Sequence, residues 1–469
     1  MTSASPLLEQ DWGAAAFLAV GRPTFDVESG AELCSGALEI LRQMNPEVHG
    51  SSELHLTTEE VVRTTESWHQ KPAIVFIAFG TFADATLAIV AAEAAARDAR
   101  IVLWSFPEQR SGKRLRRNSL CGANLAAFSL GLREVHPSGV HGRPTDPEIS
   151  HQLRDAVQGW DEMSPGHTQI DSFTATEHAA ATATANRLAE AHIGIVGDAP
   201  PGFEPCDLVD DPLPIGTTFQ RMPIGDLFAA ASQIETPVAL PHGMAGIEKL
   251  EPVATGRSLQ LREALGSLAD DHDWDALALR CWPECFTQWG GAACGPLSML
   301  SESGLPAACE ADAFGALTLL MLSEITERPA FLADLVDFDD LENSAVLWHC
   351  GVAPASMADP GRPVRAGEHP NRHMPLTMNF GLRPGPVTLA RLSRSRNQLR
   401  LVVGTGEMKA APPPFVGTSG VLTIDAPVRR FHRILISEGL EHHFGVSYGD
   451  HRRAIQALAC IWGIDVIDI

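Results

Sequence analysis

Two short, mostly apolar segments, residues 74–79 and 101–106, place the strongest constraint on the fold. Neither shows the regular alternation of apolar and polar residues that a half-solvated strand needs, so both predict strands buried on two faces. A helical stretch over residues 83–97 separates them, and residues 16–44 precede them in the same strand–helix order. This alternation predicts a parallel, doubly wound α/β sheet. Ligands approach such sheets beyond the carboxyl ends of the strands, where Thr81 follows the first buried strand.

The rest of the chain predicts two further units. An alanine- and threonine-rich helix over residues 176–192 leads into an apolar strand over residues 193–197, which begins a second α/β unit. After about residue 345, proline, glycine and arginine become more frequent, and short alternating strands are joined by turns. We therefore predict two doubly wound α/β domains followed by a β-rich C-terminal domain, with boundaries at residues 1–165, 166–344 and 345–469.

Charge and cysteine content exclude several classes of function. The net charge of −23 disfavours broad contact with nucleic acid or an anionic membrane surface. No apolar run approaches the length of about 18 residues that a membrane span needs. The nine cysteines are odd in number and the first residues lack a signal-peptide pattern, so we expect a cytoplasmic protein with reduced thiols.

Common nucleotide-binding and hydrolase motifs are absent from the sequence. It has no G-x-x-x-x-G-K-[ST] loop, no G-x-G-x-x-G after a predicted strand and no G-x-S-x-G nucleophile elbow. Only four lysines are present, which disfavours Schiff-base chemistry. Kinases, Rossmann dehydrogenases and α/β-hydrolases are therefore disfavoured.

Two carboxylates with apolar neighbours are the first candidates for chemistry. Glu284 lies in Cys281-Trp282-Pro283-Glu284-Cys285, and Asp312 lies in Cys309-Glu310-Ala311-Asp312, before a predicted helix. Tryptophan and proline partly exclude water from a neighbouring acid, which favours metal ligation or a shifted pKa. The structural alternative is that each acid caps a helix or lies on the surface.

Histidines in the C-terminal half complete a possible metal site. His349 lies in a Trp-His-Cys-Gly segment, and His442 and His443 are adjacent. Successive residues of a strand point to opposite faces, so only one of the pair is expected to coordinate a metal. Two carboxylates and a histidine suit Mn²⁺ or Mg²⁺. The alternative is a zinc site whose spacing departs from paired C-x₂-C knuckles, formed by Cys281, Cys285, Cys294 and Cys309.

These segments resemble the L-fucose/L-arabinose isomerase family, and most closely its fucose-isomerase-like branch. The likeness is carried by residues 281–312, His349-Cys350-Gly351, residues 388–392 and 406–407, and residues 441–466. It covers nearly the whole chain. The resemblance implies two α/β domains and a β-rich C-terminal domain, as the sequence pattern also predicts.

The resemblance also assigns roles to individual residues. Glu284 and Asp312 resemble the family's metal-binding carboxylates, and His443 resembles its metal-binding histidine. We further expect the two carboxylates to act as the acid and base that move the proton between C1 and C2 of the sugar. A register slip of one residue makes His442 the ligand instead. The residues expected to contact substrate are His349, His442, Arg391 and, in loops of the N-terminal domain, Thr81 and Asn118. Members of the family are homo-oligomers whose N-terminal domain leans over a neighbour's active site, so these loops are candidates for contacts in trans; the alternative is that their glycines only permit tight turns.

The expected activity is therefore interconversion of an aldose and a ketose through a cis-enediol. Mn²⁺ is the expected ion, with Mg²⁺ or Co²⁺ as alternatives, and the expected partner is a small-molecule sugar. A neutral pentose or deoxyhexose is the family's usual substrate. A sulfonated or phosphorylated sugar stays open because guanidinium groups bind such oxyanions, and candidates are Arg110, Arg114, Arg116, Arg117, Arg391, Arg394 and Arg396. Two other functions also stay open: a sugar-binding protein without activity, and carbon–carbon cleavage as in class II aldolases.

Overall fold

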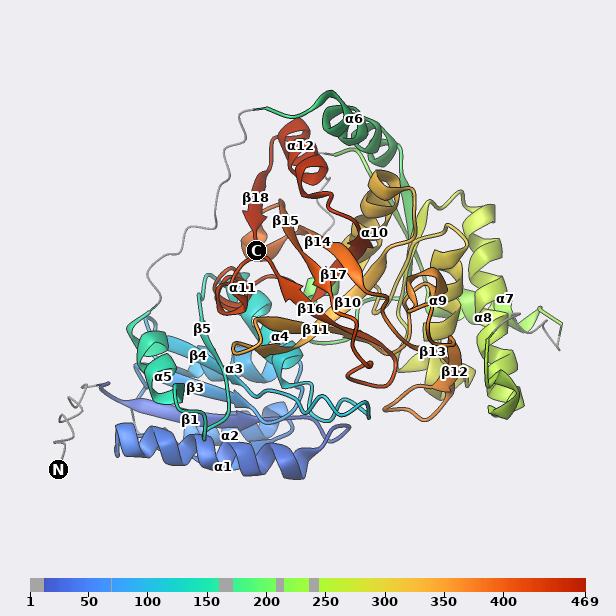
Figure 1. The fold of residues 1–469 in the computed structure, drawn as a ribbon. Coiled ribbons are helices and arrows are strands. Elements are labelled where there is room, and N and C mark those ends of the chain that lie inside the picture. The colour runs from blue at the N-terminus through green and yellow to red at the C-terminus, as the bar shows by residue number, and fades with distance from the viewer. Residues whose placement is uncertain (1–11, 69, 160–171, 208–214, 236–243) are drawn as a thin grey trace. The chain divides into compact units, whose positions relative to one another are not determined.

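A computed structural model describes residues 12–68, 70–159, 172–207, 215–235 and 244–469 of the chain (Figure 1). It divides into two compact units. Unit 1 comprises the described parts of Met1–Glu108 and Arg116–Met163 together with Leu435–Gly439. Unit 2 comprises the described parts of Gln109–Leu115, Ser164–Ile434 and Leu440–Ile469.

Unit 1 is a parallel sheet covered by helices on both faces. The sheet has five strands in the order β2-β1-β3-β4-β5. The strands are β1 (Ala15–Val20), β2 (His49–His55), β3 (Ile74–Phe79), β4 (Arg100–Ser105) and β5 (Ser138–His141). The helices are α1 (Val27–Met44), α2 (Thr58–Glu66), α3 (Ala85–Ala94), α4 (Ser119–Gly131) and α5 (Ile149–Gln158).

Burial on both faces explains why β3 lacks an alternating pattern. Phe76 belongs to the apolar core that α1 and α5 form with the sheet. Its neighbour Val75 belongs to the core on the other face, with residues of α2, α3 and α4. Because successive side chains of a strand point to opposite faces, both positions must be apolar.

Unit 2 contains a second parallel sheet, with four strands in the order β7-β6-β8-β9. The strands are β6 (His192–Val196), β7 (Thr218–Met222), β8 (Ala276–Leu279) and β9 (Ala307–Ala308). The helices of this part are α6 (Ala175–Ala189), α7 (Ile224–Ser232), α8 (Pro252–Asp271), α9 (Cys294–Glu302) and α10 (Ala313–Thr326).

The remainder of unit 2 is an antiparallel β-barrel. It belongs to a nine-stranded sheet in the order β12-β13-β16-β11-β10-β17-β14-β15-β18, closed by an additional pairing of β15 with β16. The strands are β10 (Phe331–Asp339), β11 (Ser344–His349), β12 (Arg365–Glu368), β13 (Pro375–Gly381), β14 (Gly385–Ser393), β15 (Arg400–Met408), β16 (Thr418–Ile424), β17 (His443–Tyr448) and β18 (Asp465–Asp468). The helices are α11 (Val428–Ser437), of which residues 435–437 belong to unit 1, and α12 (Arg452–Trp462).

The predicted fold class, two parallel α/β sheets followed by a β-rich C-terminal domain, is confirmed. Helix α10 joins the two parts of unit 2, because one apolar core contains Leu317 of α10, Ala278 of β8 and Leu392 of β14. The three predicted domain boundaries stay a prediction. Among the described helices, none is both long and apolar enough to cross a membrane.

Gly194 in β6 is a position where a larger side chain has no room. A Cβ built there would lie 2.2 Å from a ring carbon of the buried Trp274. Gly194→Ala is therefore expected to lower the free energy of unfolding by about 1–3 kcal/mol. Gly256→Ala in α8 meets nothing within 4 Å and should stabilise the helix by up to about 1 kcal/mol. Urea unfolding of both variants checks this, and equal midpoints would contradict the packing argument.

Candidate functional site

The turn after β9 carries two acidic residues of the candidate site. Glu310 and Ala311 adopt left-handed backbone conformations with φ of +60° and +57°. Asp312 then caps α10, where its Oδ1 accepts a hydrogen bond of 2.7 Å from the backbone N–H of Gly315. A Cβ at position 315 would lie 2.5 Å from the Asp312 carboxylate, so glycine is needed for this close approach.

Three strands of the barrel bring further polar residues beside Glu310. β10 pairs with β17, which places Asp334 opposite His443. On its other side β10 pairs with β11, which places Asp334 opposite Trp348, the residue before His349. Nε2 of His443 lies 3.6 Å from Oε2 of Glu310 and 3.4 Å from Oδ1 of Asp334. We call Glu310, Asp334, His349, His442 and His443 the acid–histidine cluster.

The two adjacent histidines of this cluster both contribute to it. Nε2 of His442 lies 3.2 Å from the same Oε2 of Glu310, and the ring centroids of His442 and His443 are 3.8 Å apart. The His349 ring stacks on His443 with a centroid distance of 5.4 Å. His443 is the first residue of β17 and His442 precedes it, so the strand alternation used in the sequence prediction does not yet apply to this pair.

The cluster fits a divalent metal ion. Oδ1 of Asp334, Nε2 of His349 and Nε2 of His443 are buried atoms without a hydrogen-bond partner in the described structure, and ligand atoms of these residues lie within 4.8 Å of one another. A second group with the same spacing joins Cys206, Glu310 and His442 to His443. Buried polar atoms normally have a partner, and converging carboxylate and imidazole groups are typical metal ligands.

Electrostatics keep three members of the cluster, Glu310, His349 and His442, in the form that accepts a cation. Burial opposes ionisation of Glu310, but the hydrogen bond with His442 and the charge of His443 outweigh it and lower its pKa to about 2. Burial lowers the pKa of His349 to about 3 and that of His442 to about 4, so both rings are neutral near pH 7. Burial raises the pKa of Asp334 to about 7.

Asp312 fixes the orientation of the His443 ring through a hydrogen bond to its Nδ1. Its Oδ2 accepts a hydrogen bond of 2.8 Å from Nδ1 of His443, which leaves Nε2 of that ring facing Glu310 and Asp334. Arg391 of β14 donates to both Asp312 oxygens at 2.7 and 2.8 Å, and both side chains are almost completely buried. A carboxylate behind a ligating histidine commonly fixes its tautomer and orientation.

The structure therefore brings five of the predicted site residues together in unit 2: Asp312, His349, Arg391, His442 and His443. Glu284 lies apart from the groups of close ligand atoms found among the described residues. Its carboxylate accepts a hydrogen bond of 2.7 Å from Nε of Arg280. Its neighbour Trp282 reaches the cluster instead, with Nε1 donating to Oε1 of Glu310 at 3.0 Å. The metal-binding role of Glu284 stays a prediction.

The two predicted residues of the N-terminal domain are buried in unit 1. Oγ1 of Thr81 accepts a hydrogen bond of 2.8 Å from the backbone N–H of Arg22. Asn118 has a left-handed backbone conformation, and its N–H donates to Glu108 at 2.7 Å. Their predicted contacts with substrate stay a prediction.

Glu310 and Asp334 were not among the predicted site residues. The signal for Glu310 is its place in the same acidic turn as Asp312, and the signal for Asp334 is an acid inside the otherwise apolar strand β10. The four-cysteine zinc alternative has no group of close ligand atoms in the described residues. Only Cys281 and Cys309 of that set are seen in contact, with Sγ atoms 2.8 Å apart.

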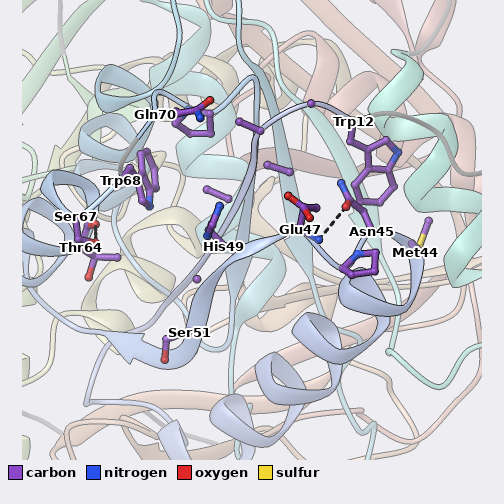
Figure 2. Close-up of a pocket in the computed structure, with 17 residues that line it drawn as sticks. Trp12, Met44, Asn45, Glu47, His49, Ser51, Thr64, Ser67, Trp68 and Gln70 are labelled. Atoms are coloured by element: carbon purple, nitrogen blue, oxygen red, sulfur yellow. Dashed lines mark hydrogen bonds between the residues drawn. The ribbon is translucent and has the colours of Figure 1, made fainter.

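A cavity of about 1020 Å³ in unit 1 is lined by other residues (Figure 2). It lies near the amino ends of β1 and β2, and its lining includes Trp12, His49, Trp68 and Gln70. None of the predicted site residues lines it. It is also at the opposite end of the strands from the edge where parallel sheets usually bind ligands.

Comparison with known proteins defines the class. Residues 375–469 match the family described as L-fucose isomerase, C-terminal domain, as the resemblance in the sequence predicts. This C-terminal match and the distant homologues together identify the protein as an enzyme of the sugar isomerase class.

Distant homologues described as sulfoquinovose isomerase align with almost the whole chain. The protein of Alkalicoccus urumqiensis is 27% identical over 464 residues, which are 97% of this chain and 98% of the relative. The protein of Priestia megaterium is 29% identical over 457 residues, or 92% and 94% of the two chains. That of a Clostridium species is 29% identical over 456 residues, or 95% and 96%.

Proposed function

We propose that this enzyme is a metal-dependent isomerase that interconverts a sulfonated aldose and its ketose through a cis-enediol. The observation that carries the metal dependence is the position of Nε2 of His443, which lies 3.6 Å from Oε2 of Glu310 and 3.4 Å from Oδ1 of Asp334. Of these three atoms, Nε2 of His443 and Oδ1 of Asp334 are buried and have no hydrogen-bond partner in the described structure. The sulfonated substrate is supported by the relatives described as sulfoquinovose isomerases. It replaces the neutral pentose or deoxyhexose as the preferred substrate.

Glu310, Asp334 and His443 hold the ion in this proposal, with His349 and His442 beside them. Mn²⁺ is the expected ion, with Mg²⁺ and Co²⁺ as alternatives; when bound, it polarises the sugar carbonyl and stabilises negative charge on the sugar oxygens. The carboxylates of Glu310 and Asp334 move the proton between C1 and C2, since both lie beside Nε2 of His443, at 3.6 and 3.4 Å.

Asp312 has a positioning role in this scheme. Both of its oxygens are engaged by Arg391, His443 and the N–H of Gly315, so it lacks a free lone pair facing the sugar. Arg391 in turn is bound to Asp312, which assigns it to the support of the site and not to the substrate. His442 and His349 present neutral rings that can contact sugar hydroxyls.

Deuterium exchange tests the reaction directly. The protein loaded with Mn²⁺ in D₂O is expected to introduce deuterium at C2 of sulfoquinovose or at C1 of its ketose, as followed by ¹H NMR. EDTA should abolish the exchange and added Mn²⁺ should restore it. Exchange that survives complete metal removal would contradict the metal-dependent mechanism.

The same experiment separates the alternatives. Exchange with phosphorylated or neutral sugars in preference to sulfoquinovose would overturn the sulfonated substrate and leave the isomerase reaction in place. Three-carbon products would indicate carbon–carbon cleavage. Metal bound without exchange in any sugar would favour the sugar-binding protein.

A further inference from the structure

A basic hairpin turn, residues 369–373, joins β12 to β13 in unit 2. It is closed by a hydrogen bond of 2.8 Å from the N–H of His373 to the carbonyl of His369. Arg114 extends the positive charge of the turn, because its Nε donates to Oδ1 of Asn371 at 2.6 Å. The guanidinium groups of Arg114 and Arg372 thus lie at one turn of a chain with a net charge of −23. It favours an anionic ligand at this place.

Arg372 of this turn is a cation without a carboxylate partner in the part of the chain that the structure describes. Its Cζ lies over two aromatic rings instead, 5.8 Å from the centroid of Trp282 and 5.9 Å from that of Phe286. Arg391 and Arg280 differ, since each is paired with an acid. Stacking on rings leaves the N–H groups of a guanidinium free to bind an oxyanion.

Trp282 connects this guanidinium to the acid–histidine cluster. One edge of its indole donates to Glu310, while Arg372 lies over its face. The carboxylate of Glu310 and the guanidinium of Arg372 are therefore separated by about the size of one indole ring. A six-carbon sugar chain spans roughly 6 Å, from C–C bonds of about 1.5 Å. A sugar with C1 and C2 at Glu310 and Asp334 can thus place its C6 substituent at Arg372.

His369 offers a second donor beside Arg372. Its ring contacts Phe286 edge-on at 5.1 Å, and its Nδ1 accepts a hydrogen bond of 3.2 Å from the N–H of Asn371. The proton of a neutral ring is then on Nε2, which can donate to a ligand.

We propose that Arg372, seated on Trp282 and Phe286, binds the sulfonate of the substrate and sets the preference for an anionic sugar, with His369 as a second donor. The inference rests on the proposed function, because it assigns one end of the sugar to the acid–histidine cluster. Sulfonate and guanidinium both stay charged across the physiological pH range, so the attraction does not depend on a titrating group.

Kinetics with matched sugars test this assignment. Arg372→Gln is expected to lower kcat/KM for sulfoquinovose by about 10²-fold, mainly through KM, since it removes a charge-assisted pair. Its kcat/KM for the uncharged 6-deoxy counterpart should change by less than about threefold. Arg372→Lys should be intermediate, because lysine keeps the charge and loses the planar fork. Arg365→Gln, an exposed arginine of β12, is the control and should keep the wild-type preference.

Equal losses for both sugars in Arg372→Gln would show a structural role and overturn the assignment, as would an unchanged preference for the sulfonated sugar. Binding of 6-deoxy-6-sulfo-D-glucitol, measured by calorimetry, separates this from failure of the proposed reaction, since the reduced sugar cannot isomerise. Loss of its binding in Arg372→Gln, but not in Arg365→Gln, supports the subsite even if the wild type isomerises no sugar. Equal binding to both variants overturns it.

Discussion

Replacing Glu310 by glutamine is expected to lower turnover on the order of 10³-fold and to weaken Mn²⁺ binding. Glutamine keeps the size of the side chain and an oxygen that can accept the hydrogen bond from Trp282. It removes the negative charge that lies 3.2 Å from His442 and 3.6 Å from His443. Loss of one anionic ligand removes several kcal/mol of charge stabilisation, and each 1.36 kcal/mol is tenfold in rate. Steady-state kinetics and metal content of the purified variant measure both effects.

Glu284→Gln is the matched comparison for this variant. Its carboxylate contacts Arg280 and not the cluster, so activity should stay within about tenfold of the wild type. The reverse result, with activity lost in Glu284→Gln and retained in Glu310→Gln, would restore Glu284 as the metal-binding carboxylate. It would also reject the acid–histidine cluster as the metal site.

Asp312→Ala is expected to lower the free energy of unfolding by about 3–5 kcal/mol, because it leaves the buried Arg391 without its counter-charge. Burial opposes ionisation of Asp312, but Arg391 and His443 outweigh it and hold its pKa below the ordinary value of 3.8. Since folding lowers the pKa of Asp312, the ionised carboxylate contributes its full stabilisation above the unfolded-state pKa of 3.8. That stabilisation is lost as the pH falls towards the lower folded-state pKa. Urea unfolding of the wild type and the variant at pH 7 measures it.

A double variant separates the structural role of the pair from its role at the site. Asp312→Leu with Arg391→Met removes both charges and fills similar space, so most of the stability should return. Activity should not return, because Nδ1 of His443 has lost the carboxylate that orients the ring. Full activity in a stable double variant would show that Asp312 does not position His443.

The sequence does not tell which of the two carboxylates in the turn after β9 joins the histidines of the site. Asp312 and Glu310 are two residues apart, and either one suits a metal. The left-handed conformations at Glu310 and Ala311 place Glu310 against His442 and His443, while Asp312 turns back to cap α10 and bind Arg391. Arg391 is 79 positions from Asp312 along the chain. No local pattern encodes that pairing.

The fold class and the half of the chain that holds the site could both be predicted from the order of residues alone. Apolar strands without alternation predict a sheet covered on both faces, and His349, His442 and His443 were predicted to belong to one site. Which acids join these histidines depends on tertiary contacts. Asp334 reaches His443 through antiparallel pairing of β10 with β17, and Trp282 bridges Glu310 to Arg372. These contacts depend on strand register and turn geometry, which bring distant residues within a few ångströms and leave little trace in the spacing of residues along the chain.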